Sequence, residues 1–161
     1  MDHLVELCRE GRIGGVGMGV PEATARAVLG RPDDESVSYD PHVLVYGGVE
    51  LAFADGELEM ITLGFGHLLE DLPAALPGVI PRIWGEGDRE TVLATLSGRG
   101  VALTAHPHPG DGVHDYTATT AMGDVVNVLF TGDRLSGVAC SRAERAAPRI
   151  LFLPAPATRP R

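Results

Sequence analysis

The sequence predicts an α+β protein made of two tandem copies of one unit, each a helix followed by an antiparallel sheet. Hydrophobic residues make up 44% of the 161 residues, which is enough apolar surface for a buried core. Helix-type spacing of apolar residues gives way to strand-type alternation twice along the chain. A pattern of Phe, a glycine-containing turn and Leu occurs at 53–58 and again at 130–135. We therefore expect one curved sheet with its helices on one face.

The first copy is expected within residues 1–65. Apolar spacing predicts one helix over 2–10, which Gly11 ends, and another over 21–29, which Pro21 opens. The buried stripe of the second helix would be formed by its apolar residues, Ala25, Val28 and Leu29. After a turn with the sequence PDDES, alternating apolar residues predict strands at 37–41, 42–46, 48–53 and 58–65.

The second copy is expected within residues 88–141, after a proline-containing connection over 66–87. Asp88 is the predicted cap of a helix over 88–98. Strands follow at 101–107, 114–121, 124–130 and 135–141. Residues 142–161 form a tail rich in arginine and proline, and its apolar run ILFL is expected to add an edge strand or fill a groove.

Three short stretches carry a family resemblance. GVGMGVPEATARAVLGRPDD resembles the repeat unit of β-lactamase-inhibitor-protein-like domains and of small outer-membrane assembly lipoproteins of the SmpA/OmlA type. RETVLATLSGRG resembles the same helix in a second copy, and VLFTGDRLSGV resembles the closing hairpin. The resemblance implies two tandem helix–sheet copies and brings no catalytic residues with it. Aromatic residues are only 5%, unlike the aromatic-rich binding face of the inhibitor, so its target is not carried over.

The glycines at 14–19 favour a turn over a phosphate-binding loop. A dinucleotide fingerprint needs a strand before the glycines and a third glycine close to the helix. Here a helix precedes the run, and Val20 occupies the third glycine position. We expect the glycines to let a short strand and a tight turn lead into the second helix.

The charge of the chain indicates a basic protein partner if charge selects the partner, and the alternative is an acidic surface that only provides solubility. The net charge is −9, and residues 1–141 carry 21 acidic residues against 8 arginines. Such a body repels nucleic acid, and no stretch approaches the ~20 apolar residues of a membrane span. The N-terminus lacks the pattern of a secretory signal, so a cytoplasmic location is expected. The residues predicted to bind the partner, on the exposed face of the sheet, are Glu50, Glu57, Glu59 and Asp124.

Candidate catalytic groups are few. Cys8 and Cys140 have apolar neighbours and no CxxC spacing, which is typical of buried thiols. The stretch HPHPGDGVHD offers metal-ligand types, but a polar hairpin loop whose prolines fix its path is the favoured interpretation, and no tight metal binding is expected. Its candidate ligands, with Asp115 beside them, are His106, His108, Asp111 and His114.

We therefore expect a non-enzymatic protein-binding module of the inhibitor or immunity-protein kind, with no cofactor. The alternative is a small-molecule or metal-dependent enzyme that uses a cavity of the sheet and the loop between His106 and Asp115. The sequence identifies neither the partner nor the oligomeric state.

Overall fold

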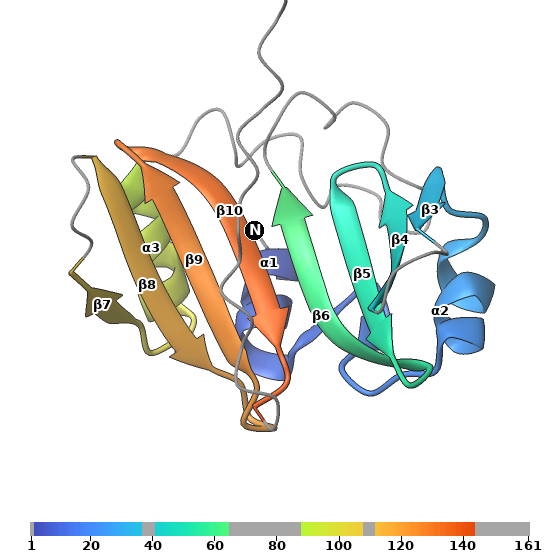
Figure 1. Ribbon diagram of the computed structural model, residues 1–161. Coiled ribbons are helices and arrows are strands. Elements are labelled where there is room, and N and C mark those ends of the chain that lie inside the picture. Colours follow the sequence, from blue (N-terminus) through green and yellow to red (C-terminus); the bar gives the residue numbers. More distant parts are fainter. Residues whose placement is uncertain (1, 37–40, 65–87, 108–111, 144–161) are drawn as a thin grey trace, which may run out of the picture.

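The computed structural model describes residues 2–36, 41–64, 88–107 and 112–143. Within these ranges the chain is an α+β protein with three helices, an eight-stranded antiparallel sheet and a two-stranded sheet (Figure 1). The helices are α1 (Asp2–Glu10), α2 (Glu22–Leu29) and α3 (Arg89–Gly98). None of these helices is long and apolar enough to cross a membrane. The strands are β1 (Arg12–Ile13), β2 (Val16–Gly17), β3 (Asp34–Ser36), β4 (His42–Tyr46), β5 (Val49–Ala54), β6 (Glu57–Gly64), β7 (Thr104–His106), β8 (Val113–Thr119), β9 (Val125–Thr131) and β10 (Arg134–Ser141).

The large sheet consists of two four-stranded meanders that meet in its centre. Its strand order is β3-β4-β5-β6-β10-β9-β8-β7, and every neighbouring pair is antiparallel. Strands β6 and β10 form the junction, with Leu63 opposite Val138 and Ile61 opposite Cys140. Each meander follows a helix in the chain, α2 in the first case and α3 in the second.

The core is continuous across the junction. Directly opposite residues of an antiparallel sheet lie on the same face, so the strand register defines rows of side chains. One buried row crosses six strands and consists of Leu44, Leu51, Ile61, Cys140, Val126 and Ala118. The helices contribute Leu7, Leu29 and Leu96, among others, to the same hydrophobic cluster. A single core therefore holds both halves together.

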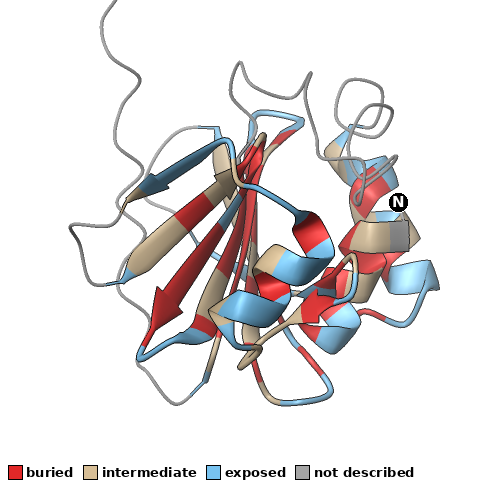
Figure 2. Cartoon of the chain, turned by 90° about the vertical axis from the view of Figure 1, so that its right-hand side faces the viewer, coloured by how far each residue is buried: buried red, intermediate tan, exposed pale blue. Residues whose placement is uncertain are grey.

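All three helices pack against the core face of the sheet. Helices α1 and α3 lie behind the strands in Figure 1, and in the view turned by 90° the helices lie on one side of the sheet (Figure 2). We call the opposite side the open face, because none of the described helices covers it. Its central rows consist of Val43, Ala52, Met60, Ser141, Val125 and Thr119, and of Asp34, Val45, Glu50, Thr62, Ala139, Asn127, Thr117 and Thr104.

The structure confirms the predicted helices and both hairpins. The three helices begin and end within one residue of the expected positions, and Asp88 caps α3 by accepting a hydrogen bond from the Thr91 amide at 2.8 Å. Phe53 lies opposite Leu58 in the β5–β6 hairpin, and Phe130 lies opposite Leu135 in the β9–β10 hairpin. In each hairpin the strand register shifts next to this pair, on the side away from the turn.

Two local predictions are wrong. The predicted turn at 32–36 contains a strand, β3, which pairs with β4 at the edge of the sheet. Val28 is 40% exposed, because the buried side of α2 is limited to Ala25 and Leu29. The predictions for 66–87 and for the ILFL run lie outside the described residues, as does most of the strand expected at 37–41.

The glycine run is a compact turn, and a side chain would be crowded at Gly17 and Gly19 in it and at Gly11 just before it. Gly11 has φ +64° and ends α1, and a Cβ there would lie 2.8 Å from Asp124 Oδ2. A Cβ on Gly19, at φ +76°, would lie 3.1 Å from the guanidinium of Arg142. The amide of Gly19 instead donates to the carbonyl of Leu58 at 2.8 Å, which ties the run to β6. The short strands β1 and β2 lead through this turn into α2, as the sequence predicts, and the glycines also allow close packing, which it does not predict.

Replacing Gly11 by alanine tests this packing. Gly100→Ala is the matched control, because Gly100 also follows a helix with φ +79° but has open space at the Cβ position. The backbone strain, about 1–2 kcal/mol, is common to both variants. We expect Gly11→Ala to lower the free energy of unfolding by about 1–3 kcal/mol more than the control, measured by urea denaturation, because its Cβ meets Asp124. Equal losses would contradict the crowding.

Candidate functional site

The predicted metal ligands do not converge in the part of the chain that the structure describes. His106 lies opposite Asp115 in the β7–β8 pair, whereas His114 lies opposite Phe130. Because neighbouring residues of a strand point to opposite faces, His106 is on the open face and His114 on the core face. His106 Nε2 is instead 2.7 Å from Thr117 Oγ1. Among the described residues no group of three metal-ligand side chains forms, and His108 and Asp111 lie outside them.

The two cysteines are buried, free thiols, which agrees with the sequence interpretation. Burial raises the pKa of Cys8 to about 12. Burial, with the negative charge of Asp124 adding to it, raises the pKa of Cys140 to about 12 as well. A thiol with so high a pKa carries almost no thiolate at neutral pH, so neither cysteine is suited to nucleophilic chemistry.

The four acids predicted to bind a partner lie in three different environments. Glu50 is exposed on the open face, opposite Val45 and Thr62. Glu57 and Glu59, at the start of β6, both bind one guanidinium: Arg142 Nη1 is 2.9 Å from an oxygen of each. These acids therefore do not form one exposed cluster.

Asp124 does not lie on an exposed face, which corrects the prediction. The residue is only 7% exposed, and it precedes β9 in a tight turn. Its carboxylate accepts a hydrogen bond from the hydroxyl of Thr120 at 3.3 Å, and its amide donates to the same hydroxyl at 3.0 Å. The turn directs the carboxylate toward Gly11 rather than away from the helices.

Asp124 lines a pocket of about 280 Å³ at one end of the sheet. We call it the methionine pocket, because Met18 and Met122 form part of its wall. Its other lining residues are Glu10, Arg12, Gly17, Arg142 and Ala143. They come from the end of α1, the β1–β2 hairpin, the turn before β9 and the residues after β10.

Arg142 is the residue of this region that sequence reasoning missed. The sequence analysis places it in the C-terminal tail, but its amide donates to the carbonyl of Glu59 at 3.2 Å, so it continues the β6–β10 pairing. Its side chain then lies against Gly19 and between Glu57 and Glu59. No local sequence signal marks it, because its partners are more than 80 residues away.

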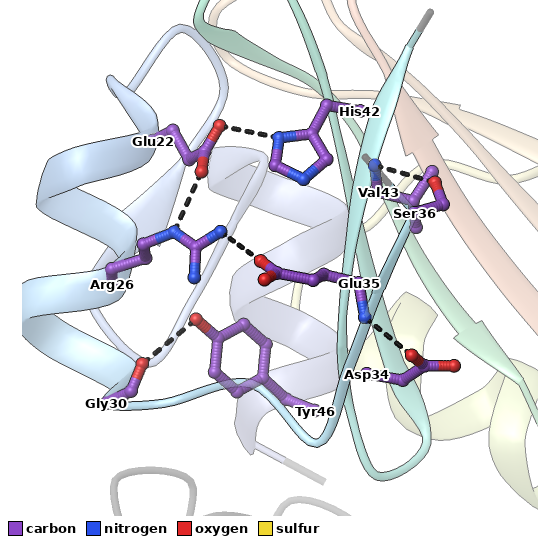
Figure 3. Close-up of polar contacts among 9 residues, drawn as sticks. All are labelled: Glu22, Arg26, Gly30, Asp34, Glu35, Ser36, His42, Val43 and Tyr46. Atoms are coloured by element: carbon purple, nitrogen blue, oxygen red, sulfur yellow. Dashed lines mark hydrogen bonds and ion pairs between the residues drawn. The ribbon is translucent and has the colours of Figure 1, made fainter. Parts of the chain in front are cut away.

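A second polar cluster fastens the edge of the sheet to α2 (Figure 3). Glu22 accepts from Arg26 Nε at 2.8 Å and lies 2.9 Å from Nδ1 of His42 on β4. Arg26 also binds Glu35 on β3. Burial favours the neutral form of Glu22, but the hydrogen bonds from Arg26 and His42 outweigh it, so the pKa of Glu22 is lower than its ordinary value. The hydroxyl of Tyr46 on β4 donates to the carbonyl of Gly30, just after α2, at 3.2 Å. These contacts together connect α2 to strands β3 and β4.

The lowered pKa of Glu22 predicts a pH-dependent contribution to stability. The contribution is present above the ordinary pKa of 4.5 and is lost as the pH falls through the lower pKa of the folded state. At pH 7 we expect Glu22→Gln to lower the free energy of unfolding by about 1–2 kcal/mol in urea denaturation. The difference from the wild type should shrink as the pH falls from 5 to 3. Glu50→Gln, an exposed control, should change little, and a difference for Glu22→Gln that stays constant with pH would refute the ionic role.

We compared the chain with models of known protein families, with curated proteins and with solved structures. Nothing matched in any of these comparisons.

Proposed function

We propose that this protein is a non-enzymatic protein-binding module for a basic partner, of the inhibitor or immunity-protein kind, and that it binds through the open face of its sheet. The observation that carries the proposal is the charge on that face. Its rows carry the acids Asp34, Glu50 and Asp115, whereas Arg134, at the turn of the β9–β10 hairpin, is the one described arginine on them. Two of the three acids flank Val45 at one end of the sheet.

The composition of the open face also supports a protein partner. Half-buried apolar side chains lie between the acids, among them Val43, Val45 and Leu129. The small residues at the centre, including Ala139 and Thr62, are only 1% and 9% exposed, so a partner would contact the residues around them. Apolar side chains beside charged ones are typical of protein interfaces, in which charge complementarity sets specificity and the association rate. The same acids would repel a nucleic acid backbone.

We do not propose the enzyme alternative. It depends on the loop between His106 and Asp115, and its two described histidines lie on opposite faces of the sheet. The described pocket at the end of the sheet is lined by charged residues and methionines, and no histidine or cysteine is among its lining residues.

We also infer that the two halves are copies of one unit, as the resemblance implies. The observations in support are the order helix then four strands in each half, and the equivalent pairs Phe53–Leu58 and Phe130–Leu135. Superposition of the two halves should place Phe53 on Phe130 and α2 on α3. A superposition that aligns the strands but leaves α2 and α3 at different positions on the core face would refute the repeat.

The test of the binding function uses two variants with the same charge change. Glu50→Gln removes a charge from the open face, and Glu90→Gln removes one from exposed α3, on the other side of the sheet. Each protein, immobilised, is exposed to a lysate of the source organism. We expect the wild type and Glu90→Gln to retain a basic protein that Glu50→Gln retains less well and that 0.5 M salt releases.

Stopped-flow mixing with the retained protein then measures the two rates. Long-range attraction between charges raises association more than it slows dissociation, and salt screens it. We expect association to slow at least threefold between 0.15 and 0.5 M salt, and to slow for Glu50→Gln at low salt. An association rate that is independent of salt and of Glu50 would overturn the proposal.

A further inference from the structure

We infer that the methionine pocket is an anchor site for one cationic side chain, a lysine or an arginine, of the basic partner. The inference rests on the proposed function and deepens it, since it names a second contact of the same partner. It follows from the charges around the pocket, from the burial of Asp124 and from the size of the cavity.

The charged residues that line the pocket balance, with Glu10 and Asp124 against Arg12 and Arg142, and the excess of negative charge comes from further carboxylates that bind these arginines behind the wall. Arg12 Nε is 3.0 Å from a carboxylate oxygen of Glu6 and 2.9 Å from one of Glu10. Arg142 is bound in the same way by Glu57 and Glu59. Each guanidinium is thus held by two carboxylates. Each of these two groups of three side chains therefore has a net charge of −1.

Asp124 adds a carboxylate that neither arginine binds. Among the described residues Arg12 and Arg142 make no ion pair with it, and its carboxylate is held by the neutral hydroxyl of Thr120. A buried carboxylate without a cation partner has lost hydration that one hydrogen bond from a neutral hydroxyl offsets only in part. Asp124 is only 7% exposed, and it lines the methionine pocket, from which a cation can approach it.

The size and the apolar part of the pocket fit a side chain rather than a metabolite. A volume of about 280 Å³ lies at the small end of the ~300–1,000 Å³ of typical small-molecule sites, which is room enough for one long side chain. Met122 is 81% exposed at the rim, and Met18 packs against the core beside it. Flexible thioethers adapt to the alkyl stem of a lysine or arginine, whose charged end would then reach Asp124.

The test uses the full-length protein labelled with ¹³C at its methionine methyl groups. The chain has only four methionines, so the pocket reporters Met18 and Met122 and the open-face reporter Met60 can each be assigned. The probes are the blocked amino acids Nα-acetyl-lysine methylamide and Nα-acetyl-arginine methylamide. The neutral isostere is Nα-acetyl-citrulline methylamide. We expect the cationic probes to shift Met18 and Met122 with saturation in the millimolar range, and the neutral one not to.

Two variants connect the binding to the carboxylates. Asp124→Asn is isosteric and should weaken the cationic probes about tenfold, because the charge that attracts them is removed. Glu10→Gln, at a half-exposed rim position, should weaken them two- to threefold and guards against a folding defect in the first variant. Glu50→Gln should leave the shifts of Met18 and Met122 unchanged.

The possible failures can be told apart. Three outcomes would each overturn the anchor site. The methyl groups of Met18 and Met122 do not shift with the cationic probes, they shift equally with the citrulline probe, or Asp124→Asn binds the cationic probes as well as the wild type does. Salt-dependent, Glu50-dependent association of the partner would still stand in those cases. If the wild type is silent but Arg145→Gln/Arg149→Gln binds the probes, the pocket serves an arginine of this chain's own tail, and the partner anchor is overturned.

Discussion

The pairing of β6 with β10 is the interaction on which the rest of this structure depends. Without it the described strands would form two four-stranded meanders, each with an unpaired edge in place of a shared centre. The register at the junction places the large residues Ile61, Leu63 and Val138 on the core face. It is a contact between strands far apart in the sequence, so the chain must close a long loop before the buried row that crosses the junction is complete.

The same register builds the methionine pocket. Arg142 follows Ser141, the last residue of β10, and its amide extends the ladder to Glu59. Its guanidinium is thereby brought to Gly19, where any side chain would meet it, and to two carboxylates at the start of β6. The glycine run is therefore adapted to an arginine more than a hundred residues further along the chain. The close approach of these segments explains the glycines without any phosphate.

Local patterns predicted the helices and hairpins, because a cap such as Asp88 or a turn such as Asp55-Gly56 acts within a few residues. Strand β3 was not predicted, because acidic residues such as Asp34 and Glu35 are typical of turns. In the structure Arg26 of α2 binds Glu35, and β3 pairs with β4 at the edge of the sheet. A charged edge strand is also what protects a sheet from further pairing. Tertiary contacts of this kind leave no periodic signal in the sequence.

The direction of a side chain was predictable only inside a strand, where successive residues point to opposite faces of the sheet. Glu50 lies inside β5, and its side chain is exposed as the alternation requires. Asp124 lies one residue before β9, where the turn with Thr120 sets its direction instead, so the same reasoning failed there. For the histidine pair the outcome depended on the β7–β8 register, since His106 opposite Asp115 puts His114 on the other face. Alternation within each strand does not fix how the two strands are aligned, so the sequence contains no signal for that register.

The ion pairs of this protein keep its charge negative rather than neutralise it. Three arginines each bind two carboxylates: Arg12 binds Glu6 and Glu10, Arg26 binds Glu22 and Glu35, and Arg142 binds Glu57 and Glu59. A guanidinium has five N–H donors, so it can hold two acceptors at once. Each of these clusters retains one negative charge while its side chains stay fixed. A lysine-free, arginine-based pairing of this kind lets the fold gain order from its acids and still present a negative field to an approaching partner. The same carboxylates therefore hold the arginines in place and, through the one charge that each cluster keeps, attract a cation.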